Sequence, residues 1–149
     1  MSIQRQITNH ITEDPRKSAA FYVRAFGMVV RFESDWFVHL AVEGQDGLEL
    51  AFLLRDHELV RNVPGPPTTG QLLTLVVDDL DAVVEAAVSA GAELVEPARD
   101  LFYGQRRALI RDPDGTVVDL STPCSPDPSW MSRVSEGEDG RFIEAPPVP

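Results

Sequence analysis

The chain repeats one pattern of elements twice, and this internal duplication limits the possible fold more than any other feature of the sequence. In residues 3–32 and again in residues 70–94, an alternating strand precedes an acidic residue, an amphipathic helix, a closing glycine and another strand. Two like modules of this kind face each other and leave a pocket where their sheets meet. The side chains at that pocket then decide the function.

The first module begins with an alternating strand over residues 6–12. Asp14 and Pro15 suit a helix N-cap and first helical position, and Gly27 suits a left-handed C-cap. Three further strands are predicted, separated by turns, over residues 28–33, 36–43 and 48–54. The first module is therefore a β-α-β-β-β unit.

The second module has the same order. A strand over residues 72–77 precedes Asp78 or Asp79 as the cap of a helix, which carries a core-facing apolar stripe and which Gly91 closes. The last strands are predicted over residues 93–96, 105–111 and 116–121, with a turn at residues 112–115. The segment between the modules, residues 55–70, is rich in proline and glycine and is predicted to be an irregular connector.

These elements predict an α+β fold in a single domain over residues 1–122, with module one at about 3–54, a linker at 55–70 and module two at about 71–122. Residues 123–149 form a Pro-rich C-terminal extension, expected to lie on the surface or to be partly disordered. Four apolar residues are candidates to anchor it, for instance against a second subunit: Trp130, Met131, Phe142 and Ile143.

The charge balance argues against several partners. The chain has 13 Lys and Arg against 24 Asp and Glu, a net charge of -11, which repels nucleic acid and anionic membranes. The negative electrostatic potential that this charge creates attracts cationic ligands, although an acidic surface also increases solubility. Cys124 is the only cysteine, so no intramolecular disulfide forms, and no signal-like apolar run follows Met1. A cytoplasmic location is the default expectation.

Several short motifs, in order, give the chain a resemblance to a known family. They are Asp14-Pro15 with Phe21-Tyr22 and Phe26-Gly27, then residues 76–81, and finally residues 103–107 leading to Arg111-Asp112-Pro113-Asp114-Gly115. With these motifs the chain resembles the vicinal oxygen chelate superfamily, which groups glyoxalase, extradiol dioxygenases, fosfomycin-inactivating transferases and bleomycin resistance proteins. The resemblance implies two half-barrel sheets that enclose a ligand cavity, often with help from a dimer partner.

The resemblance also implies where a metal would lie. The metal enzymes of the family hold a divalent ion with His, Gln or Glu on the first strand of each module and Glu on the last. Carried over to this chain, the first-strand positions are Ile7 and Leu72, and the last-strand positions are Glu49 and Asp119. Two carboxylates alone leave a transition metal underligated. His10 is expected on the opposite face of its strand. No metal or other cofactor is therefore expected, as in the bleomycin resistance branch.

A metal-free cavity of this kind would stack planar ligands on aromatic walls and receive amines with carboxylates. The predicted ligand-binding residues are Trp36, Phe37, Phe52, Phe102 and Tyr103 as walls, Glu49 and Asp119 as negative charges, and Arg106 and Arg107. Adjacent strand residues face opposite ways, so at most one of the two arginines points into the cavity. There it would either orient an anionic ligand or pair with Glu49 or Asp119 in place of the ion.

Three functions are consistent with these residues. The first is a dimeric protein that binds a small aromatic or cationic molecule without metal, for example to sequester an antibiotic. The second is a metal-dependent lyase or dioxygenase of the same superfamily, using Glu49, Asp119 and displaced ligands such as His10 or Gln71. The third is an accessory module of a biosynthetic pathway whose tail docks a partner.

Overall fold

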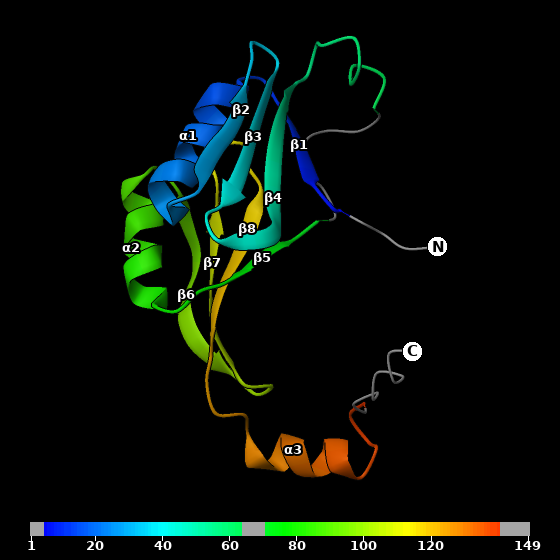
Figure 1. The fold of residues 1–149 in the computed structure, drawn as a ribbon. Helices are drawn as coiled ribbons and strands as arrows, with labels where there is room; N and C mark the ends of the chain where they lie inside the picture. The colour runs from blue at the N-terminus through cyan, green and yellow to red at the C-terminus, as the bar shows by residue number, and fades with distance from the viewer. Residues whose placement is uncertain (1–4, 64–70, 141–149) are drawn as a thin grey trace.

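The computed structural model of the chain describes residues 5–63 and 71–140 and contains two four-stranded sheets with three helices (Figure 1). The first sheet and its helix comprise β1 (Thr8–Thr12), α1 (Pro15–Phe26), β2 (Val29–Glu33), β3 (Phe37–Val42) and β4 (Gln45–Leu54). The second comprise β5 (Leu73–Val76), α2 (Leu80–Ser89), β6 (Glu93–Leu101), β7 (Gln105–Arg111) and β8 (Val117–Pro123). A third helix, α3 (Pro128–Ser135), follows.

The two sheets have the same topology. Their strand orders are β1-β4-β3-β2 and β5-β8-β7-β6. In each sheet the first strand pairs parallel to the last, and the remaining pairs are antiparallel. The predicted α+β fold of two β-α-β-β-β modules is therefore confirmed.

Local sequence signals define the helices. Asp14 caps α1 by accepting a hydrogen bond from the Lys17 amide, and Gly27 ends it with φ of 66°, a left-handed conformation that glycine adopts without strain. In the second module Asp79, rather than Asp78, is the N-cap and accepts from the Ala82 amide. The caps lie at matching places in the two modules, which allows residues to be compared by their distance from the cap.

Two segments differ from the sequence-based expectation. Strand β6 continues to Leu101 instead of ending at Glu96, because Pro97 lies where the pairing with β7 is irregular and needs no ladder hydrogen bond. The extension contains α3, whose N-cap Asp127 and following Pro128 start a helix that the composition did not reveal. Trp130 of α3 contacts Phe102, with ring centroids 5.6 Å apart. Phe142 and Ile143 lie outside the described residues.

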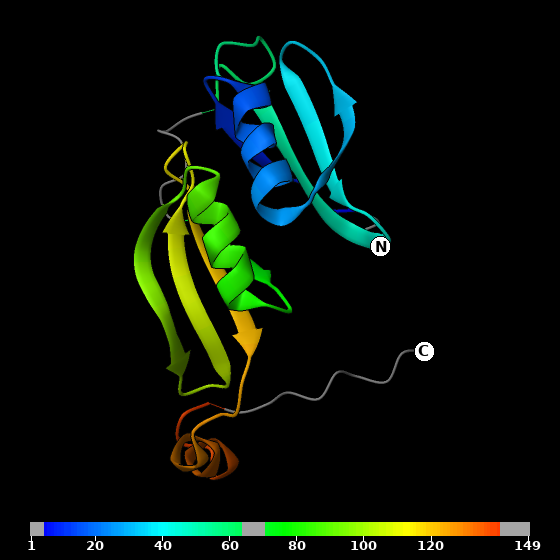
Figure 2. The ribbon, with the colours of Figure 1, turned by 90° about the vertical axis from the view of Figure 1, so that its left-hand side faces the viewer.

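Helices α1 and α2 lie on the same side of the molecule, and the two modules lie one above the other (Figures 1 and 2). Helices α1 and α2 contact each other, and a continuous core joins the modules through residues such as Phe21, Tyr22 and Leu80. Each sheet packs one face on its helix, and no helix of residues 5–63 and 71–140 covers the other face. We call the latter the open face of each sheet.

None of the helices in the described part of the chain is both long and apolar enough to cross a membrane.

Candidate functional site

A charged cluster lies on the open face of the first sheet. Neighbouring Leu50 and Phe52 of β4 belong to the core, so the alternation along the strand turns Glu49 to the open face. Arg5 Nε donates to Glu49 Oε1 at 2.7 Å, and His39 Nε2 lies 2.5 Å from Glu49 Oε2. The hydrogen bonds from Arg5 are the main cause that lowers the pKa of Glu49 from 4.5 to about 2. Glu49 is therefore ionised and already paired.

Aromatic rings continue this face. Phe37 lies 5.9 Å from Phe32 and 6.5 Å from His39, measured between ring centroids. Trp36 stacks on His57 at 3.9 Å with nearly parallel planes. Phe32 is 55% exposed although it is large and apolar. The open face of the first sheet thus offers an aromatic surface beside a charged cluster.

The open face of the second sheet carries a group of polar side chains. Asp119 of β8 is only 6% exposed, and Thr74 Oγ1 lies 3.5 Å from its Oδ2 as a donor. Burial raises the pKa of Asp119, against the opposing charge of Arg107. Arg107 of β7 lies on the same face, and its Nη2 is 3.6 Å from Glu96 Oε1. Gln105, two residues earlier on β7, also belongs to this face.

Three buried atoms on this face have no hydrogen-bond partner among the residues that the structure describes. They are Gln105 Oε1, Arg107 Nε and Asp119 Oδ1. We call Gln105, Arg107 and Asp119 the polar trio. A buried polar atom without a partner costs on the order of 1–3 kcal/mol. Three on one face therefore indicate polar groups that ordered water, or a polar ligand that displaces the side chains covering them, would satisfy.

The remaining candidate residues lie elsewhere. Phe52 is fully buried on the helix side of β4 against Tyr22, at 5.2 Å, and serves the core instead of a cavity wall. Phe102 and Tyr103 are exposed at the turn between β6 and β7, next to α3. Arg106 points away from Arg107 and pairs with Asp100 at 3.2 Å. The structure therefore places Phe37 and Glu49 on one open face, with Trp36 next to Phe37 at 5.5 Å between ring centroids, and Arg107 and Asp119 on the other.

The side chains do not fit the divalent metal that the resemblance implies. Ile7 precedes Thr8, which pairs with Leu50, so Ile7 lies opposite Glu49 and offers no donor atom. In the second sheet the residue opposite Asp119 is Thr74, and the carry-over to Leu72 missed this position by two residues. His10 packs between Tyr22 and Phe52 on the helix side, as its spacing predicts. The described residues contain no group of three or more His, Cys, Asp or Glu that could hold a metal ion.

The sequence did not predict three residues of the site, Arg5, His39 and Gln105. Arg5 pairs with Glu49, the role expected of Arg106 or Arg107. Its signal was alternation, since Arg5 lies two residues before Ile7. Ala41 of β3 pairs with Glu49 of β4, so His39, two residues from Ala41, lies on the same face as Glu49 and next to it. The glycine-rich turn between the strands gives no sequence signal for this register. Gln105 shares the alternation that places Arg107.

Comparisons with known proteins agree with this geometry. The model of the family described as Glyoxalase/Bleomycin resistance protein/Dioxygenase superfamily matches residues 7–120. "Putative glyoxylase CFP32" of Mycobacterium bovis is 28% identical over 115 residues, which cover 73% of this chain and 41% of that protein. The chain thus spans about two fifths of the length of the curated relatives it matches.

Solved structures share the fold. A glyoxalase/bleomycin resistance protein/dioxygenase family enzyme from Burkholderia phytofirmans PsJN superposes with a TM-score of 0.68 and 22% identity, covering 78% of this chain and 96% of the other. TioX from Micromonospora sp. ML1 superposes with a TM-score of 0.65 and 20% identity, covering 81% of this chain and 99% of TioX.

Proposed function

This chain belongs to the glyoxalase/bleomycin resistance protein/dioxygenase superfamily, and from that premise we propose that it binds a small aromatic or cationic molecule without a divalent metal. The observation that carries this proposal is the polar trio, whose three unpaired atoms are buried on one open face. Ligand binding would satisfy them, which is a physical reason for their arrangement.

The trio also suggests what the ligand presents. Asp119 Oδ1 and Gln105 Oε1 accept hydrogen bonds, while Arg107 Nε donates one. A matching ligand carries an amine or amide N–H next to an acceptor oxygen or nitrogen. The net charge of -11 favours a cationic group there.

We propose a homodimer in which the aromatic open face of one copy covers the polar open face of the other. Phe32 of β2, Val76 of β5 and Leu72, which directly precedes β5, are large apolar side chains that are each more than half exposed. Such residues gathered on open faces favour burial against a partner surface. Analytical ultracentrifugation tests this point: the wild-type chain should sediment as a dimer, and Val76→Glu should shift it to monomer.

Sequestration is the activity that this chemistry supports. Glu49 is held ionised by Arg5, so it is a poor proton acceptor, and the proposed contacts are non-covalent. The ligand class that we propose is an aromatic or cationic antibiotic, bound without being altered.

Calorimetric titration with a panel of aromatic amines, bleomycin included, tests the proposal. Asp119→Asn and Arg107→Gln should each weaken binding about tenfold or more, since each removes a charge-assisted contact. Arg106→Gln is the matched control, because Arg106 lies on the other face, and should leave the Kd unchanged. No binding across the panel, or binding that Asp119→Asn leaves unchanged, would contradict the proposal.

The rival proposal is a metal-dependent lyase or dioxygenase, and one observation favours it. His39 Nε2 and the Glu49 carboxylate lie within 2.5 Å, and both are metal-ligand types. Arg5 occupies the same carboxylate, however. Elemental analysis of protein purified without chelators separates the two: about one divalent ion per chain, lost in His39→Ala, would support the rival.

A further inference from the structure

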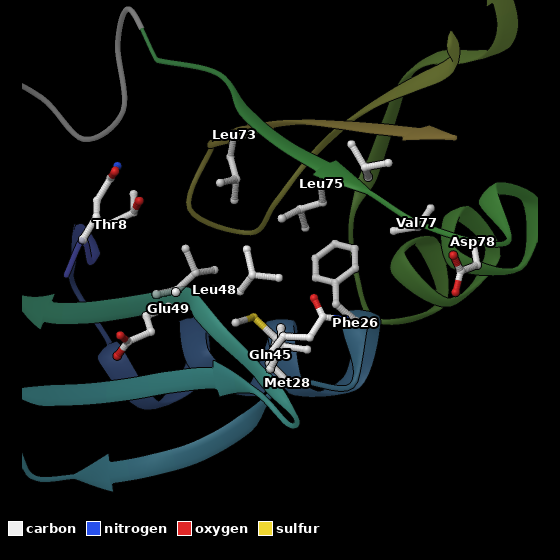
Figure 3. A pocket seen from close by; sticks show the side chains of 15 residues that line it. Thr8, Phe26, Met28, Gln45, Leu48, Glu49, Leu73, Leu75, Val77 and Asp78 are labelled. Carbon is white, nitrogen blue, oxygen red and sulfur yellow. The ribbon is translucent and has the colours of Figure 1, made fainter. Parts of the chain in front are cut away.

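A cavity lies between the modules, mainly on the helix side of the first sheet, and reaches the edges of the two open faces at Glu49 and Val76. Its volume is about 690 Å³. Figure 3 shows Leu73 and Leu75 of β5 pointing toward Leu48, Met28 and Phe26 of the first module across this space. The volume falls in the range of about 300–1,000 Å³ that holds small molecules.

The cavity exists because the two ends of the module interface differ. At one end, the turn between β7 and β8 docks on the start of α1: Asp114 accepts hydrogen bonds from Thr12 and Ser18, and Asp112 accepts one from Tyr22 at 2.8 Å. We call this the closed end. The cavity is at the open end, where the turn between β3 and β4 approaches the start of α2.

The open end lacks the residues that would close it. Counted from the N-caps Asp14 and Asp79, the counterparts of Thr12, Ser18 and Tyr22 are Val77, Val83 and Ala87. Two hydroxyl donors are thus replaced by valines and a large ring by a methyl group. Val77, Val83 and Ala87 have no polar side-chain atom that could hydrogen-bond to the β3–β4 turn, and space remains between that turn and α2.

The cavity combines an apolar body with an acidic edge. Most of the lining is aliphatic, with Phe26 and Met28 at one side. The polar residues are Thr8, Gln6, Gln45 and Asp78, apart from Glu49, which its partners hold on the open face. Within the described part of the chain, Asp78 makes no hydrogen bond or ion pair. An unpaired carboxylate at the edge of an apolar cavity favours a cation attached to a hydrocarbon.

We propose that this inter-module cavity is a second binding site, for a small aliphatic molecule with a protonated amine, independent of the polar trio. The hydrocarbon lies among Leu48, Leu73 and Leu75, and the ammonium group pairs with Asp78. Charge complementarity distinguishes this ligand from a neutral lipid or a segment of a second copy.

Octylammonium, titrated below its micelle concentration and followed by NMR shifts of leucine methyl groups, tests the site. Shifts should centre on Leu48, Leu73 and Leu75, and Asp78→Asn should weaken octylammonium about fivefold while leaving octanol unchanged. Leu48→Trp, at a half-exposed position that tolerates a larger side chain, should weaken binding about tenfold by filling the space.

A matched control variant accompanies the test. Leu94→Trp places the same ring on an exposed position of β6, outside the cavity lining, and should leave binding unchanged. The proposal is overturned if octylammonium shifts no cavity methyl group, if octanol binds as well as octylammonium, or if Leu48→Trp binds like Leu94→Trp.

Discussion

The two ends of the module interface share one plan and differ in chemistry. At the closed end, buried Asp112 accepts hydrogen bonds from the Tyr22 hydroxyl and from the amides of Asp114 and Thr116. At the open end, Val77 and Ala87 stand at the places of Thr12 and Tyr22, and a cavity of about 690 Å³ remains. The two modules have the same topology. Polar side chains at one end of their interface hydrogen-bond across it, whereas apolar side chains at the equivalent positions of the other end leave a cavity.

The largest predicted effect comes from removing the acceptor at the closed end. Asp112→Ala leaves the Tyr22 hydroxyl and two amides without their partner, so the free energy of unfolding should fall by about 2–4 kcal/mol. Urea denaturation measures it. Asp78→Ala at the open end is the matched control and should change stability by about 0.5 kcal/mol or less. Equal losses in the two variants would remove the distinction between the ends.

The contact across the closed end should be cooperative. Ser18 and Asp114 come from different modules and hydrogen-bond directly. A double-mutant cycle of Ser18→Ala and Asp114→Ala should give a coupling energy of about 1–2 kcal/mol. A coupling energy near zero would mean that the β7–β8 turn does not fasten the modules in solution.

The closed end should also respond to pH. Burial raises the pKa of Asp112 above its ordinary value, outweighing the hydrogen bond from Tyr22. The folded state therefore binds the proton more tightly than the unfolded state, so this group's contribution to stability rises as pH falls through the raised pKa. Between about pH 7 and pH 4, wild type should gain stability relative to Asp112→Asn. Equal stability changes in wild type and Asp112→Asn over this range would contradict the assignment.

The smallest predicted effect concerns the open end itself. Leu48 is 49% exposed beside the cavity, so Leu48→Trp can extend into free space without displacing the core. The free energy of unfolding should change by about 0.5 kcal/mol or less. A loss of about 2 kcal/mol or more in thermal or urea unfolding would show that the space is packed in solution.

Local signals predicted most of the fold. Apolar periodicity and the capping residues Asp14, Pro15 and Gly27 gave α1 the bounds that the structure shows. Local sequence signals gave wrong or incomplete predictions where a residue's surroundings depend on segments far away in the sequence. Pro97 masked the continuation of β6, and the partnership of Arg5 and His39 with Glu49 depends on strand register across a glycine-rich turn.

The candidate site was predictable in part for the same reason. The position of Asp119 follows from its motif, and alternation predicts that at most one of Arg106 and Arg107 faces the cavity. Which arginine does so, and how deeply these side chains are buried, depends on the packing of the sheet. The sequence predicts residues 112–115 as a turn between strands, whereas the contact of Asp112 with Tyr22 joins residues far apart in sequence. Sequence alone carries no signal for such a contact without homologous chains to compare.

Native mass spectrometry of the full chain with a ligand from the aromatic-amine panel, before and after EDTA, tests the central claim most directly. The account predicts a complex whose mass is protein plus ligand, with no divalent ion, and which EDTA leaves intact. A complex that forms only with about one divalent ion per chain, and that EDTA abolishes, would contradict it.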